Sequence, residues 1–149
     1  MPTKPTAPQA EDAALFREFE HTGDLGIELD APTRGELFRR AAIALASLLV
    51  ETASVTEIEQ REIAVEAEAD LDLMHDLLTE LLALFTVEGF IWRDASVKEA
   101  GRSLRVTLRG EPFDPARHAF RGEIKAVTYH QLMVENSPDG WRSRVIFDV

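Results

Sequence analysis

The chain has no cysteine among its 149 residues. This absence excludes disulfide bonds, thiolate metal sites and cysteine nucleophiles together, and it is typical of a cytoplasmic protein. Long apolar runs are also missing, since none reaches the ~20 residues that a membrane-spanning helix needs; we expect no membrane partner. Met1–Ala10 is rich in proline and polar residues and lacks the apolar centre of a signal peptide. We therefore expect a disordered tail over residues 1–14 and a single domain over residues 15–149.

Three common hydrolytic motifs are absent as well. The sequence contains no Gly-x-Ser-x-Gly nucleophile elbow, no Gly-x-x-x-x-Gly-Lys phosphate loop and no His-Glu-x-x-His zinc motif. These absences argue against general hydrolysis by those routes.

Positive charge is scarce in the first part of the chain. Residues 1–90 hold 6 Lys or Arg against 19 Asp or Glu, whereas residues 91–149 hold 10 against 8, and the whole chain carries a net charge of −11. An acidic chain is a poor candidate for direct nucleic-acid binding, which relies on cations that neutralise phosphates. The charge suits a basic protein partner, or it serves solubility alone.

Apolar periodicity predicts two helices and six or seven strands. The first helix begins with a capping box at Thr33–Glu36 and runs to about Glu51, and the second runs from the N-cap Asp70 to about Val87. Alternation predicts strands over residues 14–20, 26–30, 58–69, 90–99, 103–109, 123–135 and 142–149. Together these elements favour an α+β two-layer sandwich, a mainly antiparallel sheet with two amphipathic helices on one face.

The segment Arg121–His130 carries more reactive side chains than a strand that only fills a core. Lys125 is a candidate for contacting a phosphate or a partner's carboxylate, or else it forms a surface salt bridge. Tyr129 is expected to pack at an edge with its hydroxyl bonded. His130 falls on the mainly apolar face, which favours a half-buried, hydrogen-bonded histidine over a catalytic base. On the other face, Glu123 alternates with Lys125 and Tyr129.

Two further places carry carboxylates with a possible function. Asp24 lies between glycines at a strand-to-strand junction, where it could bind a hard cation or simply form an Asx turn beside His21, an ordinary surface histidine. Asp148 and the main-chain oxygens of Val149 bring several anionic oxygens to the last strand, which a cation or a proton would have to stabilise. The alternative for Asp148 is that it points to water, and His75 is interpreted as structural.

The order and placement of three segments resemble the archease family. These segments are Glu20-His-Thr-Gly-Asp-Leu-Gly-Ile27, Glu123-Ile-Lys-Ala-Val-Thr-Tyr-His130 and the terminal Ile146-Phe-Asp-Val149, and the resemblance extends over residues 15–149. Two positions depart from the family pattern: Gly23 stands where alanine is common, and Gln131 stands where glycine is common.

The resemblance implies a protein cofactor rather than an enzyme. Archeases assist the GTP-dependent RtcB-type RNA ligase of tRNA splicing and RNA repair by promoting guanylylation of the ligase and multiple turnover, and they meet RNA only through the ligase. The family's divalent-metal site, expected to hold calcium with magnesium or manganese as alternatives, carries over to Asp24, Asp148 and a main-chain oxygen of Val149. Lys125 carries over as a functional residue, and His21, Glu123 and His130 are further candidates.

Two other functions stay open from the residues alone. One is a small metal-dependent phosphoester hydrolase that uses Asp24 and Asp148 with His21 or His130. The other is a chaperone-like binding module without a defined site.

Overall fold

The computed structural model describes residues 15–149, so the expected tail over residues 1–14 lies outside the described residues. The side chain of His21 is also outside what the structure describes. Within residues 15–149 no helix is long and apolar enough to cross a membrane.

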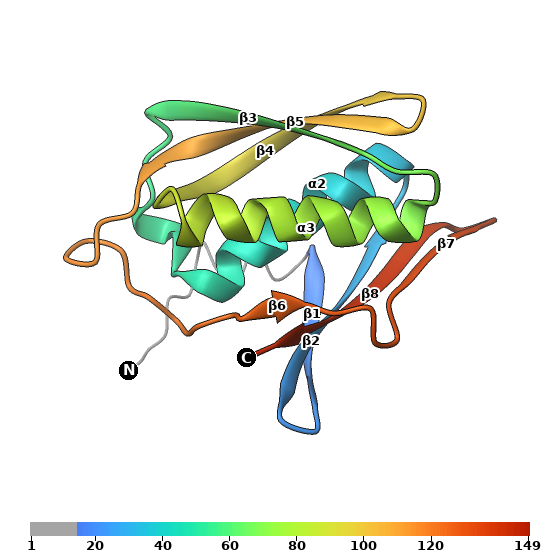
Figure 1. The fold of residues 1–149 in the computed structure, drawn as a ribbon, viewed down its shortest axis with the longest axis horizontal. Helices are drawn as coiled ribbons and strands as arrows, with labels where there is room; N and C mark the ends of the chain where they lie inside the picture. The colour runs from blue at the N-terminus through green and yellow to red at the C-terminus, as the bar shows by residue number, and fades with distance from the viewer. Residues whose placement is uncertain (1–14) are drawn as a thin grey trace.

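The strands form two separate antiparallel sheets (Figure 1). In the first sheet the order is β1-β2-β8-β6, with β7 also paired to β8; in the second it is β3-β5-β4. The strands of the first sheet are β1 (Phe16–His21), β2 (Asp24–Ala31), β6 (Ala126–Val127), β7 (Met133–Ser137) and β8 (Gly140–Asp148). Those of the second are β3 (Glu59–Glu66), β4 (Phe90–Ala100) and β5 (Ser103–Pro112).

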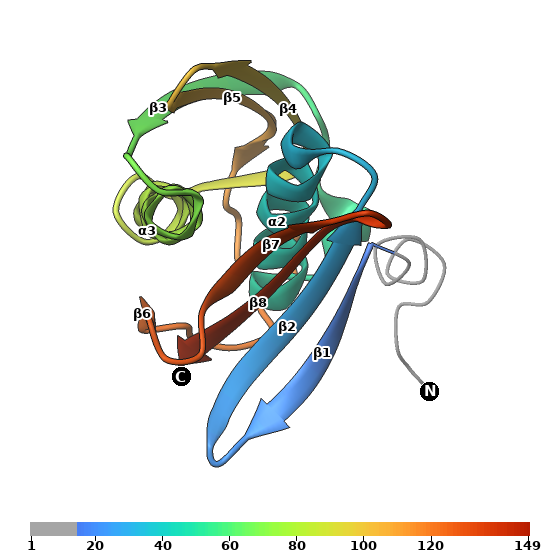
Figure 2. The same cartoon turned by 90° about the vertical axis from the view of Figure 1, so that its right-hand side faces the viewer.

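The two helices, α2 (Arg34–Leu49) and α3 (Asp70–Thr86), lie between the sheets (Figure 2). Each helix contacts strands of both sheets. In α2 every residue from Ala41 to Leu49 is buried, and a helix that is apolar all round needs cover on more than one side. The α+β class, the two helices and the antiparallel pairing are therefore confirmed, while the strands divide into two sheets instead of one.

The predicted start of α2 is confirmed in its main feature. The amide of Glu36 donates to Oγ1 of Thr33 at 3.2 Å, which makes Thr33 the N-cap. The Glu36 carboxylate accepts hydrogen bonds from Arg39 and Arg40 instead of turning back to the cap. In α3 the N-cap is Ala69, so Asp70 begins the first turn, where its charge complements the helix dipole.

The long strand predicted over residues 123–135 is wrong. Within that range the chain pairs with β8 only over Ala126–Val127 and again from Met133, the first residue of β7, and it is not a strand in between. At the end of β6 the Thr128 hydroxyl donates to the carbonyl of Ile146 at 2.8 Å and accepts from the amide of His130 at 3.2 Å, a local alternative to strand pairing. Gln131 then takes a positive φ of 53°. His130 is consequently exposed instead of half-buried.

Candidate functional site

Asp24 owes its place to a tight hairpin. Thr22 and Gly23 form the two-residue loop between β1 and β2, with φ values of 42° and 86°, as a type I′ turn requires. Asp24 is the first residue of β2 and is paired with His21 across the hairpin. Glycine at position 23 fits this turn because its backbone adopts positive φ without strain.

Asp148 reaches the same end of the first sheet from the other end of the chain. The antiparallel ladder between β2 and β8 runs from Ala31–Trp141 to Leu25–Phe147. Asp24 and Asp148 are the next residues on the two strands, although 124 positions separate them in the sequence. The fold therefore places the two predicted residues at the same end of two neighbouring strands, one position beyond the last ladder pair. We call this end of the sheet, with Asp24, Asp148 and Val149, the acidic tip.

The chain end is held firmly and does not fray. Ile146 and Phe147 are fully buried in β8, which is bordered by β2 on one side and by β6 and β7 on the other. Lys125 donates its amide to the carbonyl of Asp148 at 2.7 Å. Lys125 is exposed, and this bond places it next to the acidic tip.

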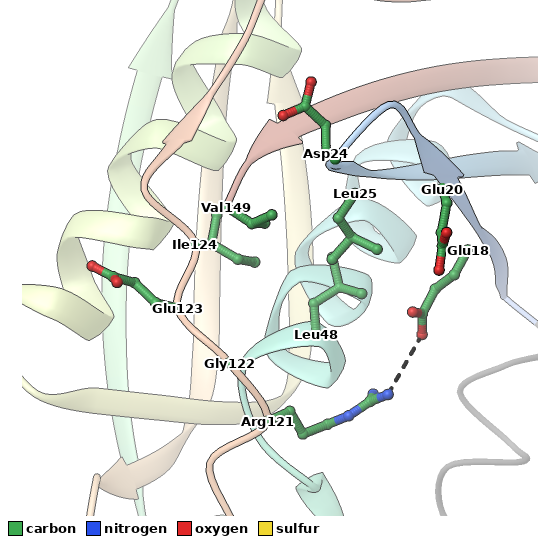
Figure 3. Close-up of a pocket in the computed structure, with 11 residues that line it drawn as sticks. Glu18, Glu20, Asp24, Leu25, Leu48, Arg121, Gly122, Glu123, Ile124 and Val149 are labelled. Atoms are coloured by element: carbon green, nitrogen blue, oxygen red, sulfur yellow. Dashed lines mark ion pairs between the residues drawn. The ribbon is translucent and has the colours of Figure 1, made fainter.

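A pocket of about 460 Å³ opens beside the acidic tip (Figure 3). Its lining includes four acidic side chains: Glu18, Glu20, Asp24 and Glu123. The one cationic residue of the lining is Arg121, whose guanidinium donates to the Ser47 carbonyl at 2.5 Å and lies 3.8 Å from the Glu18 carboxylate. In Figure 3 the Asp24 carboxylate points away from this ion pair, on the other side of Leu25. The lining residues thus carry four carboxylates against one guanidinium group.

The donor set of the acidic tip suits a hard cation. Carboxylate and main-chain oxygens are the ligands that calcium and magnesium take in proteins, and Asp24, Asp148 and Val149 supply both kinds. Among residues 15–149 no group of three or more His, Asp or Glu side chains is arranged to hold a metal. A cation held by the two aspartates would therefore need main-chain oxygen as well, as the resemblance implies for Val149.

The family model of the Archease protein family (MTH1598/TM1083) matches residues 16–149. This chain belongs to the archease family. Among curated proteins, it is 37% identical over 139 residues to the archease of Pyrococcus abyssi, covering 90% of this chain and 98% of that one. It is 36% identical to the archease of Methanopyrus kandleri over 138 residues, with 90% and 99% covered. Both relatives are named as archeases, and neither name is that of a catalyst.

Solved structures agree with this assignment. The fold matches the solution structure of protein 1598 from Methanobacterium thermoautotrophicum with a TM-score of 0.74 and 27% identity, over 90% of this chain and 98% of that one. It also matches a crystal structure from Thermotoga maritima, described as an archease and possible chaperone, with a TM-score of 0.64 and 27% identity, over 88% and 94% of the two chains.

The chain that follows β6 is held against α3 by side-chain contacts that the sequence analysis did not predict. The rings of His75 and Tyr129 stack with centroids 4.0 Å apart, and His75 Nε2 lies 3.2 Å from the Val127 carbonyl. The Tyr129 hydroxyl donates to Asp72 at 2.8 Å, which confirms that this hydroxyl is bonded. This hydrogen bond is the main cause that raises the pKa of Tyr129 to about 12. No local pattern could have indicated the pairing, because α3 and the loop meet only in the fold.

The β1–β2 hairpin is stiffened by a second arrangement. Phe19 pairs with Gly26, and its ring lies so close that a Cβ on Gly26 would come within 2.3 Å of it. The guanidinium of Arg144, on β8, lies over the same ring, with its Cζ 4.3 Å from the ring centroid. An aromatic ring over a strand glycine is a known stabilising device in sheets. It fixes the hairpin that carries Asp24.

Proposed function

We propose that this archease is a protein cofactor of a GTP-dependent RtcB-type RNA ligase. In this function it promotes guanylylation of the ligase and multiple turnover during tRNA splicing and RNA repair. The acidic tip holds a divalent cation, calcium in the first place, through Asp24, Asp148 and a main-chain oxygen of Val149. When bound, the cation would supply positive charge that offsets the repulsion between the two carboxylates.

The observation that carries the proposal is that Asp24 and Asp148 stand at the same end of the neighbouring strands β2 and β8. Like charges on adjacent strands repel each other, and a divalent cation bound at this end of the sheet would offset that repulsion. Lys125 supports the same assignment, because its amide bond to Asp148 brings it to the acidic tip. All three residues belong to segments that carry the family resemblance.

The tip's position suits contact with a second protein. The chain end, marked C, and the projecting β1–β2 hairpin lie at the same end of the first sheet (Figures 1 and 2). Phosphoryl transfer depends mainly on positioning and on electrostatic stabilisation. A rigid, negatively charged projection could therefore act by ordering groups within the partner's active site, with Lys125 placed to contact a phosphate or a carboxylate there.

The test is RNA ligation by the cognate ligase at an enzyme concentration far below that of the RNA, with and without this archease. We expect wild-type archease to convert a single turnover into many. Asp24→Asn and Asp148→Asn should each remove most of the stimulation while leaving the fold intact by circular dichroism. If ligation stays at one turnover with the wild-type protein, the proposal fails.

Asp139→Asn is a matched control. Asp139 is an exposed aspartate in the turn that precedes β8, at the strand end opposite Asp148. This variant removes the same charge and should stimulate ligation as the wild type does. Calorimetric titration of the three variants with calcium, magnesium and manganese then shows whether the tip aspartates, and not net charge, determine cation affinity.

The same variants separate the two other functions. A phosphoester hydrolase would turn over model phosphoesters without the ligase and would lose that activity on Asp24→Asn. A chaperone-like module, the description attached to the Thermotoga maritima archease, would support its partner equally well with either aspartate replaced.

A further inference from the structure

Three phenylalanine rings meet on the surface between α3 and the segment that connects β5 to β6. The ring of Phe85 lies 5.0 Å from Phe113 and 6.3 Å from Phe120, and Phe113 and Phe120 are also 6.3 Å apart. Phe85 and Phe113 pack against the core, whereas Phe120 is 52% exposed. We call these three residues the aromatic patch.

The aromatic patch rests on a rigid base. The ring of His118 lies 5.7 Å from that of Phe113 and is buried, with 1% of the residue exposed. Main-chain bonds fix both sides of Phe120: the Glu51 amide donates to the Ala119 carbonyl at 2.9 Å, and the Arg121 amide donates to the Leu49 carbonyl at 2.8 Å. An ordered aromatic side chain loses little entropy on binding, so it is suited to anchor a partner.

The aromatic patch continues into the acidic pocket. Arg121, Gly122 and Glu123 follow Phe120 directly and line that pocket. In Figure 1 the segment between β5 and β6 passes the C-terminal ends of both helices before it reaches β6, close to the chain end. One stretch of chain thus connects an exposed apolar anchor to the acidic tip.

Charge determines which partner fits this surface. Asp114 directly follows Phe113 in the chain, Glu51 lies beside Phe120 through its amide bond to the Ala119 carbonyl, and the pocket adds four acidic side chains. Arg117 is paired with Glu111 and Asp114, and Arg121 with Glu18, so the acidic side chains around the patch and pocket still outnumber these two guanidinium groups. Phosphate backbones would be repelled, and so would a second copy of this chain, which carries a net charge of −11. Residues 1–14 hold one lysine against one glutamate and one aspartate, so they do not offer basic charge either.

We propose that the aromatic patch is the docking anchor for a basic surface of the ligase, which inserts an apolar side chain against Phe120. This inference rests on the proposed function and deepens it by assigning ligase binding and ligase stimulation to two different surfaces. The aromatic patch determines affinity, and the acidic tip determines the stimulation that follows binding. Exposed contiguous apolar surface is typical of such interaction sites.

The experiment titrates the ligase with archease and measures both ligation rate and direct binding by fluorescence anisotropy of labelled archease. For Phe120→Ser we expect the half-stimulating concentration and the Kd to rise about 10- to 100-fold, as for a truncated interface anchor, with the plateau rate unchanged. Phe120→Leu keeps an apolar side chain and should stay close to the wild type. Asp24→Asn should show the opposite pattern, with a lower plateau and an unchanged Kd.

Three outcomes would overturn the docking proposal. The first is an unchanged Kd for Phe120→Ser, and the second is a lower plateau at an unchanged Kd. The third is a wild-type dimer at assay concentrations that Phe120→Ser dissociates, because the patch would then be covered by a second copy. Stimulation by the wild type together with any of these leaves the cofactor function standing. A wild-type protein that binds the ligase through Phe120 without stimulating it would defeat the cofactor function alone, and one that does neither would defeat both.

Discussion

Asp24 and Asp148 stand one residue beyond Leu25 and Phe147, the pair that closes the ladder between β2 and β8. The ladder is fixed by buried residues behind it, since Ile27, Val145 and Phe147 are fully buried. A shift of one residue would turn each of these side chains to the other face. The core therefore determines that Asp24 and Asp148 come to the same end of the sheet.

Replacing Asp24 by asparagine tests two quantities: the effect of its charge on stability without a metal, and its part in stabilisation by calcium. In buffer with a chelator we expect Asp24→Asn to differ from the wild type by less than about 1 kcal/mol, because the change conserves the shape of a partly exposed side chain at a strand end. With saturating calcium the wild type should gain in Tm, since a ligand that binds only the folded state stabilises it. Thermal unfolding with chelator and with calcium measures both effects.

The control for this comparison is Asp139→Asn, which should keep the full calcium response. Equal Tm gains in Asp24→Asn and the wild type would mean that calcium binds elsewhere.

The hairpin that presents Asp24 depends on the missing side chain of Gly26. A methyl group there would meet the Phe19 ring at 2.3 Å and displace it from Arg144. We expect Gly26→Ala to lower the free energy of unfolding by about 1–2 kcal/mol, as overpacking does, and to weaken ligase stimulation. Adding Phe19→Leu should restore part of both, and urea unfolding with the ligation assay would detect this. No recovery in the double variant would mean that Phe19 is not the contact that matters.

Gln131 holds the positive φ of the loop after β6 without being glycine. Residues that carry a Cβ rarely adopt a backbone φ of 53°. Gln131→Gly should therefore stabilise the protein by about 0.5–1 kcal/mol through relief of this strain, whereas Gln131→Ala keeps the Cβ and should not. Chemical denaturation of both variants tests this, and an equal effect of glycine and alanine would contradict it.

The sequence allowed prediction of the features that depend on local periodicity. The two helices follow from apolar residues at helical spacing, and the start of α2 follows from Thr33. Pairing of β2 with β8 could not be derived in this way, because it joins residues more than a hundred positions apart. The resemblance, and not the pattern, indicated that Asp24 and Asp148 share a site.

The same limits explain what was missed around Arg121–His130. Alternation of apolar and polar residues is the same in a strand and in an extended connection, so Ile124 and Val127 could not show that pairing stops after two residues. A leucine stripe at helical spacing indicates only one buried face of a helix. It could not show that α2 is covered on both sides by separate sheets. The stacking of His75 on Tyr129 could not be predicted, because it depends on the packing of α3 against the loop after β6.

Glu111 is a buried carboxylate that holds the connection between β5 and β6. It is 4% exposed and accepts hydrogen bonds from the Thr56 amide at 2.7 Å, from Arg117 and from His118 Nε2 at 3.0 Å. The Asp114 amide donates to His118 Nδ1, so Nε2 carries the proton. Burial alone would raise the pKa of Glu111, but these hydrogen bonds outweigh it and lower the pKa from 4.5 to about 2.

This lowered pKa predicts how acid destabilises the protein. A carboxyl group whose pKa is lower in the folded state contributes stability above pH 4.5, and that stability is lost as the pH falls toward 2. The shift corresponds to about 3 kcal/mol. We expect Glu111→Gln to be less stable by about that amount at neutral pH and to lose less stability than the wild type in acid. Urea unfolding at several pH values measures this, with the exposed Glu135→Gln as control. Parallel pH profiles for Glu111→Gln and the wild type would show that another group causes the acid sensitivity.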